Sequence, residues 1–148
     1  MRLLYRDWRP TRLGRWINHV NGWWSGLGLP PRFQAVLEVQ GRHSGRRRSN
    51  PVVIASVDGN RYLVSMLGSK SDWVQNVEAA HGDAVIRQGG RRRVHLVAVP
   101  IEQRAPVLRE YVRIARSGRE HFPLAMGAPL SEFRAIAERY PVYRVDPA

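Results

Sequence analysis

Two short turn signals, Asp58-Gly59 and Gly89-Gly90, constrain the fold of this chain more than any other feature. Each turn lies between two segments of alternating or continuous apolar residues, which is the pattern of a β-hairpin. A third pair of such segments flanks an arginine-rich turn. Because strands joined by hairpins run antiparallel, the sequence predicts a small antiparallel barrel of the α+β class. The expected strands are residues 34–40, 51–57, 61–67, 83–88, 92–99 and 141–145.

Helical patterns flank these strands and interrupt them once. Residues 12–27 carry apolar residues at helical spacing, with arginine, asparagine and histidine on the opposite face. Residues 71–80 begin with residues that commonly cap helices and predict a short inserted helix. Two further helices are expected at residues 101–115 and 130–140, and Pro106 is tolerated because it falls near a first turn. The helices are therefore expected at the periphery of the barrel.

The chain is strongly basic, with a formal net charge of +12. Only one of its 24 basic residues is lysine, and the planar guanidinium of arginine binds phosphate and carboxylate groups in pairs. The expected partner is an anion: a nucleic acid, an acidic lipid surface or an anionic small molecule. The chain has no cysteine, and its five histidines show no metal-ligand spacing, so no metal site is expected. At 148 residues without repeats or linkers, it is predicted to form a single cytoplasmic domain over 1–148.

The arginine-rich turn is the stretch GRHSGRRRSNP between the first two expected strands. Gly41 and Gly45 permit backbone angles closed to other residues and let the main chain approach a ligand. Ser44 supplies a hydroxyl, while Arg42 and Arg48 supply guanidinium groups on either side. Such a turn could cradle a phosphate or carboxylate with the help of main-chain amides. A solvated basic hairpin loop is the alternative, and composition alone favours it.

The turn and its flanks, LEVQGRHSGRRRSNPV, resemble the signature TxGRxSGxxRxxPL of the deazaflavin-dependent nitroreductase family of split β-barrel oxidoreductases. Downstream, DGNRYLVSMLG and DWVQNVEAAHGDAVIRQGG are similar to the family's DGxRYxLVAS and WYxNLxANPxVxVxxGG. The resemblance covers residues 35–99 well. It implies an FMN-binding-like split β-barrel of mainly antiparallel strands with peripheral helices, in a two-electron oxidoreductase that forms a homodimer.

The resemblance also implies a cofactor, the 8-hydroxy-5-deazaflavin coenzyme F-420, which carries a phosphate and an oligoglutamate tail. Its reduced form would pass a hydride from C5 to a quinone-like or other electron-poor small molecule, and no catalytic side chain is assigned. In the implied site the turn holds the phosphate and tail, and the next strand runs along the side of the deazaflavin ring. A further strand and the inserted helix line the pocket. The residues are Gly41, Arg42, Ser44, Gly45 and Arg48; Asn50, Pro51 and Val52; Ser65, Met66 and Leu67; and Trp73, Asn76 and Val77.

Two segments depart from the family pattern. The stretch GSKSD before Trp73 is shorter than in the family, and the loop ARSGREHFPLAMG lacks the tyrosines of the best-known nitroreductases, so reduction of nitroimidazoles is not expected. Tyr111, Tyr140 and Tyr143 remain as proton donors or pocket walls. Trp73 has two interpretations, core packing or a cofactor contact. Asn76, one helical turn later on the same face, is harder to place in a core because its amide needs partners.

Three alternatives stay open from the sequence. FMN could replace the deazaflavin in the same barrel, the chain could be a basic nucleic-acid-binding module, or it could bind the cofactor without turnover. The nucleic-acid alternative is not favoured, because the tryptophans cluster in residues 12–27 rather than alternating with arginines along strands. That segment either caps an open end of the barrel or lies on an anionic membrane surface, at the inner face of the membrane.

Overall fold

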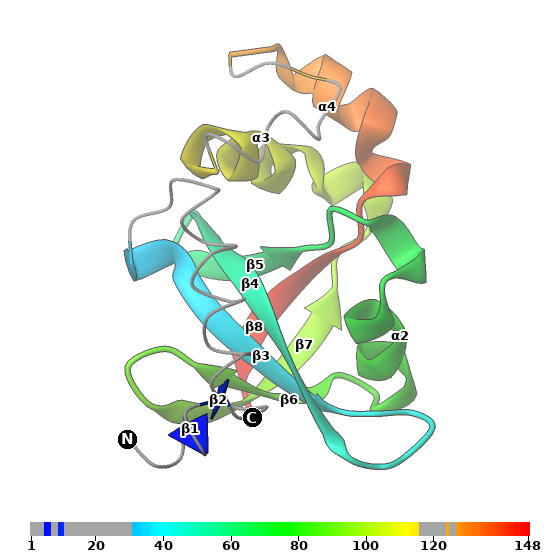
Figure 1. Ribbon diagram of the computed structural model, residues 1–148. Helices are drawn as coiled ribbons and strands as arrows, with labels where there is room; N and C mark the ends of the chain where they lie inside the picture. Colours follow the sequence, from blue (N-terminus) through cyan, green and yellow to red (C-terminus); the bar gives the residue numbers. More distant parts are fainter. Residues whose placement is uncertain (1–4, 7–8, 11–30, 116–123, 125–126) are drawn as a thin grey trace.

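The structure, a computed structural model, describes residues 5–6, 9–10, 31–115, 124 and 127–148 (Figure 1). The helix expected at residues 12–27 and most of the loop before the last helix lie outside the described residues. The elements, in chain order, are β1 (Tyr5–Arg6), β2 (Arg9–Pro10), η1 (Pro31–Phe33), β3 (Gln34–Gln40), β4 (Arg47–Val57), β5 (Asn60–Val64), η2 (Gly68–Lys70), α2 (Asp72–Ala79), β6 (Asp83–Arg87), β7 (Arg91–Ala98), η3 (Ile101–Gln103), α3 (Ala105–Ile114), α4 (Leu130–Ile136), η5 (Ala137–Arg139) and β8 (Val142–Pro147).

Strands β3 to β8 close into a barrel in the order β3-β4-β5-β8-β7-β6, and every neighbouring pair is antiparallel. Strands β1 and β2 form a separate small pair. Figure 1 shows α3 and α4 stacked over one end of the barrel and α2 along its side. The predicted α+β barrel of antiparallel strands with peripheral helices is therefore confirmed.

The hairpin predicted at Asp58 and Gly59 is present, and both residues have positive φ, 51° and 80°. Two consecutive positive φ angles are typical of the tight turn whose twist matches that of the flanking strands. The hairpin between β6 and β7 also turns at the predicted glycines, where Gly89 has a φ of 69°. The turn chemistry read from the sequence therefore fixed the pairing of these strands.

Two strand boundaries differ from the prediction. Strand β4 begins at Arg47 rather than at residue 51, because the ladder with β3 continues through Val39 opposite Arg48 and Gln40 opposite Arg47. Strand β5 ends at Val64, so Ser65, Met66 and Leu67 do not line a strand as expected. The Ser65 hydroxyl instead donates to the carbonyl of Gly68 at 2.8 Å, which turns the chain toward α2. Leu67 is 84% exposed in that turn.

Strand β4 is buried on both faces, which explains its continuous apolar run. Val52 and Ile54 face the barrel interior, whereas Val53 and Ala55 belong to a second core beneath α3 and α4. Strands covered on both sides read as unbroken hydrophobic segments, while strands covered on one side alternate. The barrel therefore has an inner core, and its helices add an outer one.

Candidate functional site

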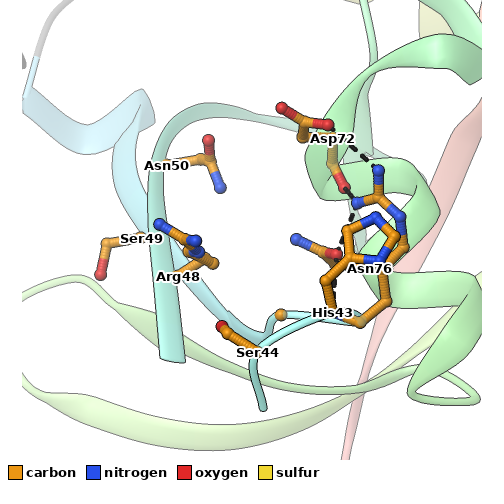
Figure 2. Close-up of a pocket in the computed structure, with 9 residues that line it drawn as sticks. His43, Ser44, Arg48, Ser49, Asn50, Asp72 and Asn76 are labelled. Carbon is orange, nitrogen blue, oxygen red and sulfur yellow. Dashed lines mark hydrogen bonds and ion pairs between the residues drawn. The ribbon is translucent and has the colours of Figure 1, made fainter. Parts of the chain in front are cut away.

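A cleft of about 380 Å³ opens between the arginine-rich turn, the first residues of β4 and the start of α2. Figure 2 shows its side chains arranged around an open centre, with Arg48 and Asn50 on one side and Asp72 and Asn76 on the other. Its lining residues are Gly41, Arg42, His43, Ser44, Arg48, Ser49, Asn50, Asp72 and Asn76.

The turn is held by its own main chain. The Gly41 amide donates to the Arg46 carbonyl at 2.7 Å, the Gly45 amide donates to the Gly41 carbonyl at 3.0 Å, and the Arg46 amide donates to Ser44 Oγ at 3.2 Å. A Cβ at position 41 would lie 3.0 Å from the Arg46 carbonyl oxygen, and Gly45 has a φ of 72°, so both glycines are needed. Because these three amides bond within the turn, they are not offered to a ligand as a nest would require.

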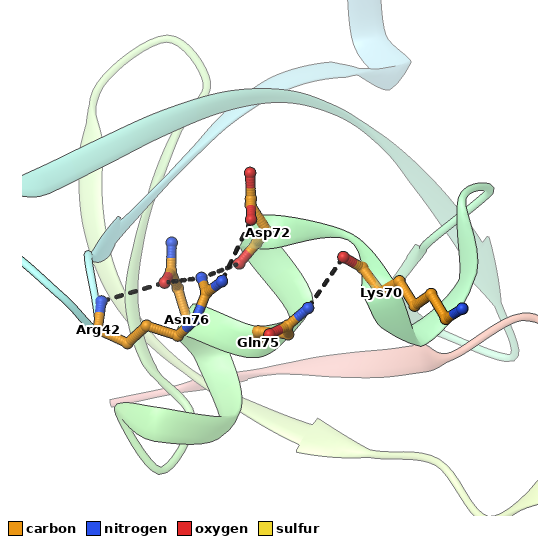
Figure 3. Close-up of polar contacts among 5 residues, drawn as sticks. All are labelled: Arg42, Lys70, Asp72, Gln75 and Asn76. Carbon is orange, nitrogen blue, oxygen red and sulfur yellow. Dashed lines mark hydrogen bonds and ion pairs between the residues drawn. The ribbon is translucent and has the colours of Figure 1, made fainter.

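Arg42 is fastened to α2 at one wall of the cleft (Figure 3). Its backbone amide and its Nη1 both donate to Asn76 Oδ1, at 3.1 and 2.7 Å. Nη1 also lies 3.4 Å from the Asp72 carbonyl oxygen, and Nη2 lies 3.3 Å from Asp72 Oδ1. The side chain of Arg42 is 23% exposed, whereas that of Asp72 is 82% exposed. The amide of Asn76 thus sets the position of this guanidinium.

Several donors in the cleft lack an acceptor. Within the described part of the chain, no hydrogen bond or ion pair involves the side chains of Arg48 or Asn50, and none involves Asn76 Nδ2. Asn76 is only 4% exposed, and Figure 2 shows its amide nitrogen directed into the cleft. A buried donor without a partner costs free energy, and a guanidinium favours an anion. The cleft is therefore built to accept a group rich in oxygen acceptors, such as a phosphate or a carboxylate.

Alternation along β4 explains which arginines of the turn reach the cleft. Arg48 and Asn50 pair with residues of β3 that face the barrel interior, so they continue the inner face. Arg47 points to the opposite face and contacts Glu38 at 3.3 Å. That buried carboxylate also binds Arg87 at 3.4 Å and Arg91 at 2.9 Å. Arg47, Arg87 and Arg91 thus share one counterion away from the cleft.

The structure brings six of the sequence-predicted site residues into the cleft, namely Gly41, Arg42, Ser44, Arg48, Asn50 and Asn76. Gly45 instead lines a hollow on the outer face beside Glu38 and Arg47. Three residues, His43, Ser49 and Asp72, line the cleft and were not predicted. His43 and Ser49 lie within the recognised motif, whereas nothing in the local sequence marks Asp72 as a partner of Arg42.

The remaining predicted residues lie outside the cleft lining. Trp73 and Val77 pack in the barrel core, and the Trp73 ring centroid lies 5.9 Å from that of Tyr143. Of the two interpretations of Trp73, the structure supports core packing. Val52 belongs to the same core and Pro51 precedes it on β4, while Ser65, Met66 and Leu67 form the turn before α2.

The three tyrosines considered as proton donors are all buried in the two cores and do not line the cleft. Burial raises the pKa of Tyr143 to about 12, and the neighbouring Glu78 adds to the shift. Burial also raises the pKa of Tyr111, whose hydroxyl donates to the sulfur of Met66. Tyr140 is 8% exposed beneath α3 and α4. The phenols of Tyr111 and Tyr143 therefore stay neutral over the ordinary pH range.

The described residues offer neither a metal site nor a membrane-spanning helix. No group of three or more histidine, aspartate or glutamate side chains there is placed to hold a metal ion. None of the helices in the same residues is long and apolar enough to cross a membrane.

Comparison with known proteins places the chain in a family. The sequence model of that family, described as F-420-H(2)-dependent quinone reductase, matches residues 12–121, which is most of the chain. No curated protein matches the sequence.

Solved structures share the fold at low identity. An F-420-H2-dependent reductase is 18% identical with a TM-score of 0.50, over 80% of this chain and 97% of that one. A protein of unknown function from Agrobacterium tumefaciens is 11% identical with a TM-score of 0.57, over 86% of this chain and 53% of that one. A structure described as a domain-swapped dimer is 15% identical with a TM-score of 0.55, over 90% and 98% of the two chains.

The family match confirms the expected cofactor, coenzyme F-420, and the expected oxidoreductase class, and it favours both over the FMN and nucleic-acid alternatives. The structural likenesses support the barrel fold. On this evidence the chain belongs to the F-420-H(2)-dependent quinone reductase family.

Proposed function

We propose that the cleft binds the phosphate and acidic tail of coenzyme F-420, and that the enzyme passes a hydride from the reduced cofactor to a quinone-like or other electron-poor acceptor. One observation carries the binding part of this proposal. Arg48, Asn50 and the buried amide of Asn76 face one cleft without an acceptor among the described residues. Phosphate and carboxylate groups supply only acceptors, so they satisfy all three.

Different residues of the cleft would contact different sides of that anion. Arg48 supplies a forked cation on the strand side, and Arg42 supplies a second cation on the helix side, held in place by Asn76. The Ser44 hydroxyl accepts from the Arg46 amide and keeps its own hydrogen for a ligand oxygen. Two guanidiniums against one carboxylate leave the cleft with an excess of positive charge. That excess matches a ligand with several negative groups.

The reduced cofactor, when bound, supplies the hydride, so no side chain of this protein needs to act as a nucleophile. The protein supplies position, through the anchored phosphate, and a low-dielectric wall, through the inner face of the barrel. We keep the sequence-based assignment to the cofactor as a proposal for Gly45, Pro51, Met66 and Leu67, whereas Val52 and Ser65 are buried and would act only by supporting their neighbours. The first four residues lie outside the cleft, so their contacts would involve parts of the cofactor other than the anchored anion.

A binding titration tests the proposal. Oxidised coenzyme F-420 is added to the full chain while tryptophan emission is recorded, with FMN as the comparison ligand. We expect tighter binding of F-420, because its tail offers more carboxylates than the single phosphate of FMN. Equal or tighter binding of FMN would contradict the assignment.

A pair of arginine variants locates the binding. Arg48→Ala should weaken the cofactor by about 1.5–3 kcal/mol, the range for a hydrogen bond to a charged group. Arg46→Ala removes the same charge from an exposed position outside the cleft and should leave affinity within about twofold. A larger loss in Arg46→Ala than in Arg48→Ala would show that the cleft has been misplaced.

Three further features are proposed from the sequence and the family. The acceptor is quinone-like, following the family's description, and turnover of a soluble quinone with reduced F-420 tests it. The protein is a homodimer, as one structural neighbour is described as a dimer, and light scattering at several concentrations tests it. Residues 12–27 contact an anionic membrane surface, and cosedimentation with anionic vesicles tests it, with neutral vesicles as the control.

A further inference from the structure

We propose that Asp72 is a built-in competitor for the ligand anion at Arg42, and that it lowers the affinity of the cleft for its cofactor. The inference rests on the proposed function, because it assumes that the cleft receives an anionic group. It concerns Asp72, the last residue of the short stretch GSKSD before Trp73.

Arg42 makes two kinds of contact. One fixes the position of its guanidinium, and we call it the anchor; the other only occupies one of its donors, and we call it the cover. The anchor is Asn76 Oδ1, which accepts from both the backbone and Nη1 of Arg42 and belongs to a side chain that is 4% exposed. The cover is the Asp72 carboxylate, which meets only Nη2, at 3.3 Å. Charge-assisted hydrogen bonds are usually shorter than 3 Å, so the contact with the carboxylate is weak. Loss of the cover would leave the anchor, and therefore the position of the guanidinium, unchanged.

The carboxylate of Asp72 is free to leave. Its side chain is 82% exposed, and rotation into solvent would restore its hydration. The ion pair occupies one Nη2 hydrogen of Arg42 and offsets the charge of its guanidinium. An incoming anion therefore competes with Asp72 for this guanidinium, and it binds more strongly once the carboxylate has turned away. Figure 3 shows the carboxylate of Asp72 and the amide of Asn76 on either side of the guanidinium.

Removal of this carboxylate should tighten anion binding, which is the opposite of what structural damage does. Asp72→Asn keeps the shape of the side chain, leaves at most a neutral hydrogen bond to Nη2 in place of the ion pair, and raises the positive charge of the cleft by one. We expect the dissociation constant to fall about two- to fivefold at low salt, the size typical of an exposed ion pair. Because the group is exposed, the gain should shrink as ionic strength rises.

The experiment measures binding to the full chain by calorimetry, with oxidised coenzyme F-420 and, separately, inorganic pyrophosphate. Asp83→Asn is the matched control, because Asp83 is 79% exposed, lies on β6 outside the cleft and gives the same change in net charge. A thermal melt of each variant checks that it is folded. The inference predicts tighter binding of both probes in Asp72→Asn and no change in Asp83→Asn.

A double-mutant cycle tests whether Asp72 acts through Arg42. In an Arg42→Ala background, Asp72→Asn should increase the binding free energy by less than half as much as it does in the parent protein. An equal gain in that background would overturn the inference, because Asp72 would then act on the ligand directly. Unchanged or weaker binding in Asp72→Asn, or an equal gain in Asp83→Asn, would also overturn it.

The two probes separate this inference from the proposed function. If F-420 does not bind but pyrophosphate binds more tightly to Asp72→Asn, the proposed function fails and the inference about Asp72 stands for a different anion. If F-420 binds equally to parent and variant, the inference fails and the proposed function stands. If neither probe binds the parent protein, both are wrong.

Discussion

Replacement of Asn76 by aspartate should weaken cofactor binding by one to two orders of magnitude while leaving the protein folded. Asn76 makes two kinds of contact with one amide. Its oxygen accepts from the backbone and Nη1 of Arg42 at 3.1 and 2.7 Å, and its nitrogen points into the cleft without an acceptor among the described residues. Aspartate keeps the acceptor for Arg42 and turns the donor into a second acceptor. The substitution therefore separates the structural contact from the contact with a ligand.

The expected loss follows from two contributions. A hydrogen bond from the amide to a charged oxygen contributes about 1.5–3 kcal/mol. Two unit charges about 5 Å apart repel by roughly 3 kcal/mol at an effective dielectric constant of 20. The cleft is open to water, so we take about half of the sum, roughly 2–3 kcal/mol, which corresponds to a loss of affinity of about thirty- to a hundredfold. The stability of the empty protein should change by less than about 1 kcal/mol, because the new carboxylate lies against Arg42.

The assay is the titration with coenzyme F-420, combined with urea denaturation of each variant. Asn60→Asp is the matched control, since Asn60 is exposed on the β4–β5 hairpin and undergoes the same chemical change outside the cleft. Near-normal binding by Asn76→Asp would refute the argument that this amide donates to the ligand. Failure of Asn76→Asp to fold would show instead that the buried carboxylate is not compensated by Arg42. Asn76→Leu loses both the donor and the acceptor for Arg42, and a loss of binding larger than that of Arg42→Ala would then report the donor.

Two other predictions concern stability. Glu38→Gln should lower the free energy of unfolding by roughly 1–3 kcal/mol in urea denaturation, because Arg47, Arg87 and Arg91 lose a shared counterion. The expected loss is small for three ion pairs, since each arginine side chain is more than half exposed. An unchanged midpoint would show that the three pairs contribute nothing. Because the folded pKa of Tyr143 is raised from 10.0 to about 12, its contribution to stability is fully present below pH 10 and is lost as pH rises toward 12. Tyr143→Phe should flatten this part of the pH profile, and a profile as steep as that of the parent protein would contradict the assignment.

Two hairpins of the barrel were accessible from sequence because their signals are local, whereas the pairings of β3 with β6 and of β5 with β8 were not. Asp58-Gly59 and Gly89-Gly90 mark tight turns by chemistry that involves only neighbouring residues. The start of β4 was missed because residues 47–50 are polar, and a polar run beside glycines resembles a loop. Their strand conformation comes from the ladder with β3, which no local pattern reveals.

The cleft was predictable only in part, for a related reason. The turn motif located Arg42, Ser44 and Arg48, but the facing wall depends on how α2 docks, and that docking brought in Asp72. Trp73 went to the core because an aromatic ring on the inner face of a helix packs against the barrel, here against Tyr143. Pairings between residues 30 or more positions apart, such as Arg42 with Asn76, follow from the fold and not from spacing.

The partners of the arginines, and not the net charge, decide what this protein binds. The turn carries four arginines, yet Arg47 serves Glu38 on the outer face and Arg42 is partly neutralised by Asp72. Arg48 has no partner among the described residues, because alternation along β4 turns it toward the cleft and away from Glu38. Binding through Arg48 and a released Arg42 involves two cations, so the salt dependence of cofactor affinity should be shallow. A dependence as steep as that of a polyanion bound along the whole basic surface would mean that the many exposed arginines, and not the cleft, make the contact.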